Sequence, residues 1–338
     1  MTAGGKTMWA IVQDRYGSAP EDVLQLAEID RPTIGDSEVL VRVHAAGLDR
    51  GTWHIMAGLP YPMRLMGFGV RAPKDRVRGR EVAGRVEAVG NTVTGLQVGD
   101  EVFGIAEGSF AEYARARADK LARKPTSLAF ERAAAVTISA LTALQAVRDR
   151  GRVHPGQSVM IIGASGGVGT FAVQIANTFG AHVTAVCSTS KVDLVRSLGV
   201  DQVIDYTVKD IDGTQRYDVI LDIGGHRSLR KLRHTLTRHG TLVIVGSETG
   251  GRWLGGFDRS IRAVLLSPFV SQTLGALTNS ENASDLAVLA ELVESGKITP
   301  VIDRTYPLHE AVAAIRHMLD GQARGKVVIA VLPRRAVR

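Results

Sequence analysis

The spacing of hydrophobic positions changes twice along this 338-residue chain. Residues 8–120 contain short runs in which apolar and polar positions alternate, separated by glycines, as at 38–44, 82–90 and 98–104. Such runs predict β-strands in a compact β-rich domain. Between residue 129 and about residue 280, short apolar runs alternate with segments of helical period, which predicts an α/β domain with a doubly wound parallel sheet. Its first five strands are expected at 158–162, 182–187, 202–205, 218–223 and 241–245.

The end of the chain returns to a mixed pattern. It predicts helices over 284–295 and 308–319 and strands over 300–302 and 325–332. A chain of this length is too long for a single core, so we expect two domains. The tail is expected to complete the N-terminal domain. That domain would consist of residues 1–127 and 284–338, with the parallel-sheet domain at 128–283 inserted between its two parts.

A run of small residues follows the first strand of the parallel block and has the form A-x-G-x-x-G, in which an alanine replaces the first glycine of the dinucleotide-binding fingerprint. Gly166 would let the backbone approach a pyrophosphate, and Gly169 would let a helix beginning near Thr170 lie close to its strand. The amides at the helix N-terminus would face the anion. A tight strand-to-helix turn without a ligand is the alternative. The candidate cofactor residues here are Ala164, Ser165, Gly166, Gly167 and Val168.

The end of the second strand indicates which dinucleotide is bound. Ser188, Thr189 and Lys191 stand where an NAD site carries an acidic residue for the ribose hydroxyls. Hydroxyls and a cation suit the additional phosphate of NADPH, and Tyr206, after the third strand, could close over it. The sequence therefore favours NADPH over NADH. The alternative is that Lys191 and its neighbours only begin a solvated helix.

Composition excludes several classes of protein. No run approaches 18 apolar residues, and residues 1–6 lack the apolar core of a signal peptide. The single cysteine, Cys187, falls in a strand that is expected to be buried. These features predict a cytoplasmic protein without a membrane partner. A net charge of +7 and basic clusters at 71–80 and 227–233 could suit nucleic acid, but aromatic residues make up only 5% and no nucleic-acid motif accompanies the charge. We therefore expect no nucleic-acid partner.

The chain resembles the medium-chain dehydrogenase/reductase superfamily and, within it, the zinc-free quinone oxidoreductase branch. The shared residues are GREVAG at 79–84, VGDEV at 98–102 and, around the cofactor loop, positions 156–157, 164–167, 169 and 174. Met160 and Asn177 depart from the branch pattern. The resemblance implies a GroES-like domain with an inserted Rossmann domain. It also implies a zinc-independent, NADPH-dependent reductase of quinones or α,β-unsaturated carbonyls. A zinc-independent alcohol dehydrogenase and an NADPH-binding sensor or structural protein with little turnover are the alternatives.

The same resemblance implies that no metal is bound. Zinc-dependent members have a cysteine where this chain has Asp49 and a histidine where it has Arg80, and the four structural cysteines are absent here. A cation at residue 80 would repel zinc, which needs three protein ligands in a catalytic site. A set formed by Asp49, His54 and Glu81 is the remaining alternative, although neither spacing nor supporting residues favour it.

The candidate catalytic residues are Asp49, His54 and Tyr61. In the branch that the chain resembles, the aligned positions line the cleft for substrate and nicotinamide, but their usual asparagine and tyrosine are here Asp49 and His54. His54 could deliver a proton, because histidine titrates near neutral pH. Packing roles are the alternatives for His54 and for Tyr61, which lies between two prolines. The loop 58–74 is expected to shape the substrate pocket.

The resemblance implies further cofactor contacts at Thr142, on the nicotinamide side, and at Lys326, although a plain strand-edge lysine is the alternative for the latter. Ligands of parallel sheets bind at the carboxyl ends of strands, so the loops after two more strands are also candidates. Their residues are Ile223, Gly224, Val245, Gly246 and Ser247.

The apolar segment 263–274 is expected to form a sixth, edge strand of the parallel sheet. An exposed apolar edge tends to be covered, and relatives commonly pair such edges across a two-fold axis, so we expect a homodimer through 263–274. Pro268 could mark the point at which this pairing stops.

Overall fold

A computed structural model describes residues 7–211, 213–246 and 251–331 of the chain. It divides into two compact units, one formed by residues 1–138, 281–294 and 300–338 and the other by 139–280 and 295–299. The predicted α/β class, with a parallel-sheet domain inserted into a β-rich one, is confirmed. The boundary between the units was expected after residue 127, but it lies between residues 138 and 139. It falls inside helix α3 (Phe130–Gln145), which contributes residues to both units. None of the described helices is both long enough and apolar enough to cross a membrane.

The first unit is built on a mainly antiparallel sheet with the strand order β14-β15-β3-β4-β5-β7, in which β6 also pairs with β3. A separate hairpin-like pair consists of β1 (Thr7–Val12) and β2 (Gln25–Asp30). The strands of the sheet are β3 (Glu38–Leu48), β4 (Glu81–Val89), β5 (Glu101–Ile105), β6 (Tyr113–Arg117), β7 (Leu121–Arg123), β14 (Ile302–Pro307) and β15 (Lys326–Ala330). The helices of this unit are α1 (Pro20–Val23), α2 (Arg50–Ala57), α8 (Ala283–Glu294) and α9 (Ala311–Leu319), besides the start of α3.

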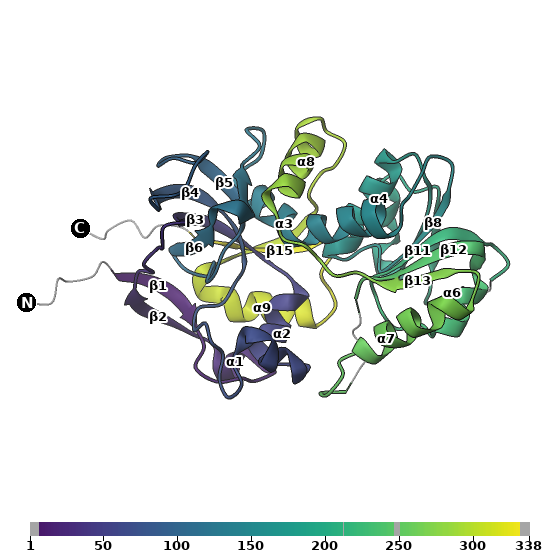
Figure 1. Ribbon diagram of the computed structural model, residues 1–338, viewed down its shortest axis with the longest axis horizontal. Helices are drawn as coiled ribbons and strands as arrows, with labels where there is room; N and C mark the ends of the chain where they lie inside the picture. Colours follow the sequence, from purple (N-terminus) through teal and green to yellow (C-terminus); the bar gives the residue numbers. More distant parts are fainter. Residues whose placement is uncertain (1–6, 212, 247–250, 332–338) are drawn as a thin grey trace, which may run out of the picture. The chain divides into compact units, whose positions relative to one another are not determined.

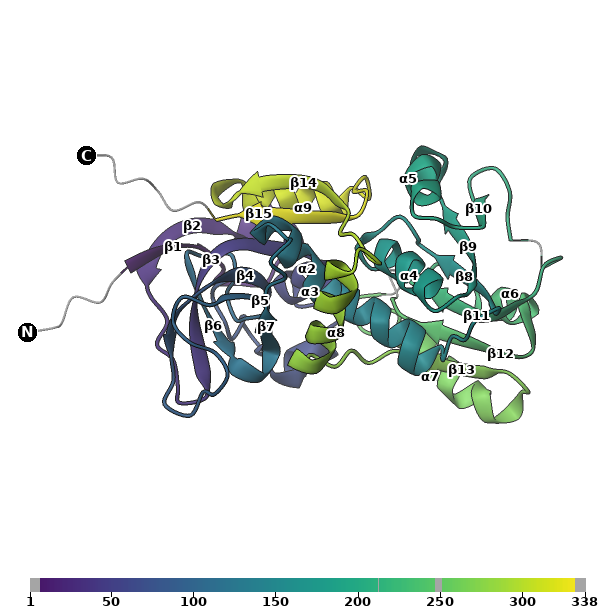
Figure 2. The ribbon, with the colours of Figure 1, turned by 90° about the horizontal axis from the view of Figure 1, so that it is seen from above.

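The tail joins the sheet of the first unit. Strand β15 pairs antiparallel with β3, with Val327 opposite Leu48, and parallel with β14. Helix α9 packs against both tail strands, as Figure 2 shows. The strand predicted at 300–302 instead runs from Ile302 to Pro307, because β14 forms its ladder with β15 only from Ile302 onward. The strand predicted at 98–104 begins at Glu101, since Gly99 has a φ of 93° in a turn before it.

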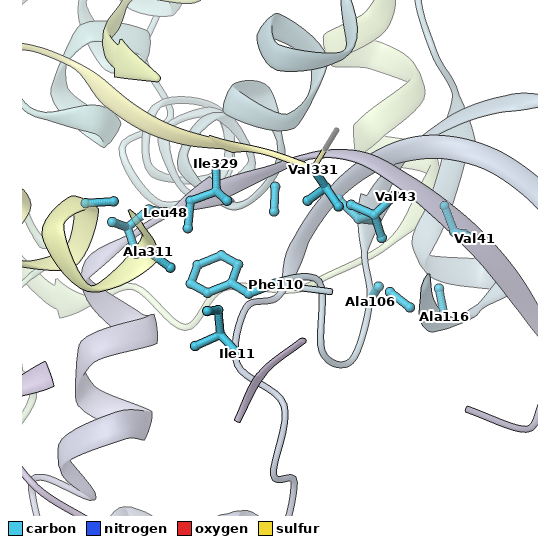
Figure 3. Close-up of a cluster of buried hydrophobic side chains, with 14 of the residues drawn as sticks. Ile11, Val41, Val43, Leu48, Ala106, Phe110, Ala116, Ala311, Ile329 and Val331 are labelled. Atoms are coloured by element: carbon cyan, nitrogen blue, oxygen red, sulfur yellow. The ribbon is translucent and has the colours of Figure 1, made fainter. Parts of the chain in front are cut away.

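The core of the first unit combines strands from both ends of the chain. Ile11, Val41 and Phe110 come from the N-terminal part, and Ile329 comes from β15; each is at most 1% exposed (Figure 3). Ala311, on α9, lies in the same cluster. Burying one large apolar side chain contributes about 1.5–3 kcal/mol. The shared core therefore stabilises the packing of the C-terminal tail in the first unit.

The second unit contains a six-stranded parallel sheet in the order β10-β9-β8-β11-β12-β13. This is the order of dinucleotide-binding folds, in which the chain starts in the middle and winds outward in both directions. Helices α4 and α7 lie on opposite faces of the sheet in Figure 1. The strands are β8 (Ser158–Ile162), β9 (His182–Cys187), β10 (Gln202–Asp205), β11 (Tyr217–Asp222), β12 (Leu236–Ile244) and β13 (Thr273–Ala276). The helices are α4 (Gly167–Thr178), α5 (Val192–Ser197), α6 (Leu229–His234) and α7 (Phe257–Leu266).

The expectation that 263–274 forms the sixth strand is wrong. Residues Phe257–Leu266 form helix α7 and Ser267–Phe269 a 3-10 turn, so only the end of the segment contributes to β13. The apolar run continues a helical period that starts at Phe257, in which Ala263 is buried while Ile261 and Leu265 are exposed. Pro268 lies within the 3-10 turn and not in a strand.

Candidate functional site

The turn between β8 and α4 holds the glycine-rich segment. Helix α4 begins at Gly167, earlier than the expected start near Thr170, and its N-cap is Gly166, which has no side chain to cap the helix amides. A Cβ atom on Gly169 would lie 2.1 Å from the carbonyl oxygen of Gly163, so only glycine permits this approach of helix and strand. A Cβ on Gly166 would meet only that same oxygen within 4 Å, at 3.6 Å. The backbone is therefore open to a ligand at the helix N-terminus, as pyrophosphate binding requires.

The other residues predicted to contact the cofactor at this turn are buried or half-buried. Ala164 and Ser165 are 0% and 6% exposed, and Gly167 and Val168 are half-buried. Sequence reasoning assigned no role to Gly163, which has a φ of 84° in the left-handed region that favours glycine. Its place directly after a buried strand was the signal that could have identified it.

The carboxyl ends of β8 and β11 meet beside the turn. The amides of Ile223 and Gly224, which follow β11, donate to the carbonyl oxygen of Ile162 at 3.0 and 3.3 Å. A Cβ on Gly163 would lie 3.1 Å from the Gly224 nitrogen, so the two loops are in close contact. The structure thus brings these predicted residues together at the edge of the sheet where ligands of parallel sheets bind.

The loop after β12 extends the same edge. The amides of Val245 and Gly246 donate to the carbonyl oxygen of Asp222 at 3.0 and 3.3 Å. A Cβ on Gly246 would lie 2.4 Å from the carbonyl oxygen of Ile223, which explains a glycine at this position. Ser247, the next predicted residue, lies outside the described residues.

Thr142 lies on α3, and its Oγ1 accepts a hydrogen bond from Asn279 Nδ2 at 3.0 Å. This contact orients the hydroxyl within the second unit. The nicotinamide contact predicted for Thr142 stays a prediction.

The residues predicted to select NADPH follow β9 and β10. The amide of Lys191 donates to the carbonyl oxygen of Ser188 at 2.9 Å across a 3-10 helix that starts at Thr189. The amide of Tyr206 donates to the carbonyl oxygen of Cys187 at 3.1 Å, and the Tyr206 side chain is 53% exposed. The loop after β9 and the loop after β10 therefore lie side by side, at the carboxyl ends of two paired strands.

Asp205 is a carboxylate in this region that sequence reasoning read only as a strand residue. Its Oδ1 accepts a hydrogen bond from Thr207 Oγ1 at 2.7 Å. Hydrogen bonds from Thr189 and Thr207 lower the pKa of the Asp205 carboxyl. An ionised Asp205 would oppose the attraction of a nearby cation for a phosphate.

Helix α2 carries two of the three candidate catalytic residues. Asp49 is its N-cap, and its Oδ1 accepts hydrogen bonds from the amide of Thr52 at 2.8 Å and from Thr52 Oγ1 at 3.1 Å. His54 Nδ1 lies 3.0 Å from the carbonyl oxygen of Leu59. A carbonyl can only accept, so Nδ1 carries a proton in this contact and a neutral His54 has Nε2 as its acceptor. Asp49 therefore has a capping role besides any catalytic one.

Tyr61 belongs to a stacked group that fixes the loop after α2. The Arg64 guanidinium lies 4.9 Å from the centre of the Tyr61 ring and 4.3 Å from that of Tyr16. Arg64 Nε also donates to the carbonyl oxygen of Gly58 at 2.9 Å. The Tyr16 hydroxyl donates to the carbonyl oxygen of Phe68 at 2.8 Å, which ties the other end of the loop to the same group.

Lys326 is a buried residue and not a strand-edge lysine. Strand β15 lies between β14 and β3, and the Lys326 side chain is 1% exposed. Its Nζ donates to Oε2 of Glu81 at 2.6 Å. Burial raises the pKa of the Glu81 carboxyl to about 7, while the neighbouring Lys326 acts to lower it. The strand-edge alternative is thus wrong, and the cofactor contact of Lys326 stays a prediction.

The residues at the zinc positions do not fit zinc. Asp49 caps α2, Glu81 pairs with Lys326, and Arg80 Nη2 lies 2.5 Å from Oε1 of Glu281. Among the described residues, no group of three or more His, Cys, Asp or Glu side chains is placed to hold a metal ion. These positions therefore lack the three ligands that a catalytic zinc site needs.

Arg78 is a further residue that sequence reasoning counted only as part of a basic cluster. It is 3% exposed, and it lines a cavity of about 60 Å³ together with Thr52 and Ile55 of α2. Burial lowers the pKa of Arg78 to about 10, which leaves it charged at neutral pH. Its position three residues before Glu81, in a stretch rich in charged residues, gave no signal that its side chain is buried.

Comparison with known proteins identifies the family. A family model described as "Alcohol dehydrogenase GroES-like domain" matches residues 35–126, and one described as "Zinc-binding dehydrogenase" matches residues 198–329. The mouse protein "NAD(P)H oxidoreductase RTN4IP1, mitochondrial" is 32% identical over 367 residues, covering 98% of this chain and 91% of the relative. The "2-methylene-furan-3-one reductase" of Solanum lycopersicum is 34% identical over 335 residues, covering 94% and 78%.

A solved structure agrees with these relatives. The quinone oxidoreductase from Coxiella burnetii superposes with a TM-score of 0.82 at 28% identity, covering 97% of this chain and 100% of that one. The sheet order, the open glycine turn and the whole-length similarity to oxidoreductases agree with one another. The chain belongs to the medium-chain dehydrogenase/reductase superfamily, in its quinone oxidoreductase-like branch.

Proposed function

We propose that the protein is a zinc-independent reductase that uses NADPH to reduce a quinone or an α,β-unsaturated carbonyl compound. The observation that carries the proposal is the turn between β8 and α4, where Gly166 leaves the helix amides open at the carboxyl edge of the sheet. Bound NADPH would supply the hydride. The names of relatives, a quinone oxidoreductase and a furanone reductase, support a conjugated acceptor.

A conjugated acceptor suits a site without a metal. Hydride addition to such a molecule spreads negative charge over several atoms, so the demand for a Lewis acid is smaller than with an isolated ketone. His54 is proposed to protonate the resulting enolate. Because Nδ1 already donates to Leu59, protonated His54 would deliver the proton from Nε2. Asp49 holds the start of α2, and Tyr61 is proposed to line the pocket.

Three groups of residues are proposed to hold the cofactor. The turn residues 164–168 and the loops at Ile223, Gly224, Val245 and Gly246 are proposed to hold the dinucleotide. Ser188, Thr189, Lys191 and Tyr206 are proposed to bind the additional phosphate of NADPH, which makes NADPH the preferred form. Thr142 and Lys326 are proposed to lie on the nicotinamide side.

The proposal extends to the cell and to assembly. The buried Cys187, whose thiol pKa burial raises to about 11, supports a reducing compartment, and we propose the cytoplasm. The mouse relative is named as mitochondrial, so fractionation of the native cell is the direct test. A homodimer is proposed through the region that contains α7 and β13.

Turnover distinguishes the proposed function from its alternatives. Purified protein is mixed with NADPH and either 1,4-benzoquinone or an unbranched 2-alkenal, and loss of the reduced nicotinamide absorbance is followed. We expect oxidation that depends on the acceptor. Activity only with a saturated alcohol and NADP⁺ would identify an alcohol dehydrogenase. NADPH binding without turnover of any acceptor would identify a sensor or structural protein.

A further inference from the structure

Arg78 is a buried cation without a protein partner. Its side chain makes no hydrogen bond or ion pair to any described residue, and its buried Nε has no hydrogen-bond partner. A buried charge is costly unless it is paired or hydrogen-bonded. Five N–H groups arranged as a planar fork match the two oxygens of a carboxylate. The side chain therefore has the chemistry of an anion-binding site.

The cavity beside Arg78 has the size of a small group. Its volume is about 60 Å³, enough for a carboxylate or a few water molecules. Thr52 and Ile55 of α2 form one wall, and Phe68 of the following loop forms another. The site thus lies within the first unit, next to helix α2 and the loop after it, which together carry the candidate catalytic residues.

The backbone around Arg78 is fixed. The Arg78 amide donates to the carbonyl oxygen of Ile11 at 3.0 Å, and its own carbonyl accepts from the amide of Phe110 at 2.8 Å. Gly79 has a φ of 90°, and a Cβ there would lie 2.3 Å from the Phe110 ring. The fixed backbone and the burial of the side chain both restrict Arg78, so less conformational freedom is lost when it binds a ligand.

The other charged residues of the cavity leave Arg78 as its available cation. Arg80 pairs with Glu281, and Glu107 pairs with Arg115. Asp75 is exposed and makes no ion pair with Arg78 within 4.0 Å, although its charge raises the Arg78 pKa. Asp75 therefore acts at a distance, where solvent weakens its repulsion of a bound anion.

We propose that Arg78 binds a carboxylate of the substrate, so that the acceptor is a conjugated carbonyl compound that carries a carboxylate group. This inference rests on the proposed function. In the reaction, the hydride of NADPH forms a C–H bond at the β-carbon as the C=C π bond breaks. The enolate then takes one proton at the α-carbon, giving the saturated keto acid and NADP⁺. The carboxylate itself is unchanged and serves to hold the substrate.

Direct binding tests the anion site without turnover. Acetate is titrated into the whole protein by calorimetry, in a buffer free of carboxylates. Arg78→Met should weaken acetate binding by about tenfold or more, since the bidentate contact is lost. The control Arg76→Met removes a nearby exposed arginine, paired with Asp14, and should leave binding unchanged. Asp75→Asn should strengthen it. Failure of acetate to bind the wild-type protein, or equal binding by wild type and Arg78→Met, would overturn the proposal.

Stability measurements separate ligand binding from a structural role. Arg78→Met replaces an unpaired buried charge by an apolar side chain, so its melting temperature should be no lower than that of the wild type. If Arg78→Met unfolds, Arg78→Lys serves instead: it keeps the charge but loses the fork and should weaken acetate binding by a smaller factor. Equal acetate affinity of Arg78→Lys and wild type would contradict the bidentate contact.

Kinetics with a matched pair of substrates tests the substrate class. The probes are trans-4-oxo-2-pentenoate and its methyl ester, with NADPH. We expect a lower KM for the acid than for the ester in the wild type and no such preference in Arg78→Met. Equal KM values for acid and ester in the wild type would refute the substrate class. No turnover of either, with acetate binding still dependent on Arg78, would refute the proposed function but not the anion site.

Discussion

Lys326 Nζ lies 2.6 Å from Glu81 Oε2, and each of these side chains is 1% exposed. The pair joins β4 to β15, the strands on either side of β3. Gly47 of β3 makes room for it, because a Cβ there would lie 1.8 Å from the same Glu81 oxygen. The contact thus connects the tail to the N-terminal part of its unit by charge as well as by the shared core.

Removing one member of this pair should destabilise the protein strongly. Lys326→Met leaves a buried carboxylate without its cation, and we expect a loss of about 3–5 kcal/mol in the free energy of unfolding. Urea unfolding measures this loss. The double variant Lys326→Met with Glu81→Met should recover much of it, since no unpaired charge remains. A single variant as stable as the wild type would show that the pair does not contribute.

The pH dependence of stability should reflect Glu81. Burial raises its folded-state pKa to about 7, above the ordinary value of 4.5. The folded state therefore binds this proton more tightly than the unfolded state, which favours folding at low pH. That contribution is fully present below pH 4.5 and is lost as pH rises through about 7. The unfolding free energy of the wild type, relative to Glu81→Gln, should fall over this range. A constant difference between the two proteins would contradict the shift.

Lys191 should distinguish the two nicotinamide cofactors. If it binds the additional phosphate of NADPH, Lys191→Ala should cost about 1–3 kcal/mol of NADPH affinity and leave NADH affinity nearly unchanged. Fluorescence titration of both cofactors measures this. Asp205→Asn is the converse change and should strengthen NADPH binding, because it removes the opposing charge. Equal weakening of both cofactors by Lys191→Ala would refute the phosphate contact.

Zinc should be absent from the purified protein, and activity should survive a chelator. The reason is that Asp49, Arg80 and Glu81 are engaged in a helix cap and two ion pairs. Elemental analysis of the protein, before and after dialysis against EDTA, checks this. One tightly bound zinc per chain that is lost together with activity would overturn the metal-free assignment, despite the residues at these positions.

The loop after α2 should depend on Tyr16. Its single hydroxyl proton is shared between the carbonyl oxygens of Phe68 and Gly69, at 2.8 and 2.6 Å, so Tyr16→Phe loses this contact while keeping the ring under Arg64. We expect a stability loss of about 1 kcal/mol and faster hydrogen exchange at 64–70. Unchanged exchange in this segment would show that the hydroxyl does not hold the loop.

Local pattern was sufficient for much of the nucleotide-binding unit. Strands β9 and β10 have the bounds that their short apolar runs predicted, and the glycine turn lies at the expected edge. The pattern failed at α7, where the window beginning at residue 263 opens with four apolar positions and contains no charged residue. The charged residues that reveal the helical period, Asp258 and Arg262, precede that window, so helix and strand could not be distinguished from it.

The polar interior of the first unit could not be predicted. Glu81 and Lys326 are 245 residues apart, and no local signal links them. Arg78 stands in a stretch of charged residues that is typical of a solvated surface, yet its side chain is buried. His54 was identified by its residue type, but its contact with Leu59 depends on the turn after α2. Such contacts follow from the tertiary fold and not from periodicity.

A homodimer remains the expected assembly. Its interface would not be an edge strand formed by 263–274, because most of that segment belongs to α7 and the 3-10 turn after it. In the described part of the chain, β13 is the last strand of its sheet. Leu265 and Phe269, beside it, are 65% and 84% exposed. Burying such side chains against a second copy contributes about 1.5–3 kcal/mol each, which favours dimerisation through this surface.

Charged substitutions on this surface should separate the two copies. Leu265→Glu and Phe269→Glu place carboxylates where apolar contacts are expected, and since both side chains are exposed, the fold itself should be unaffected. Light scattering at micromolar concentration should show a dimer for the wild type and a monomer for the double variant. Val208→Glu is the matched control, because Val208 is 80% exposed elsewhere in the same unit and should leave the dimer intact. A monomeric wild type, or a dimer that persists in the double variant, would exclude this interface.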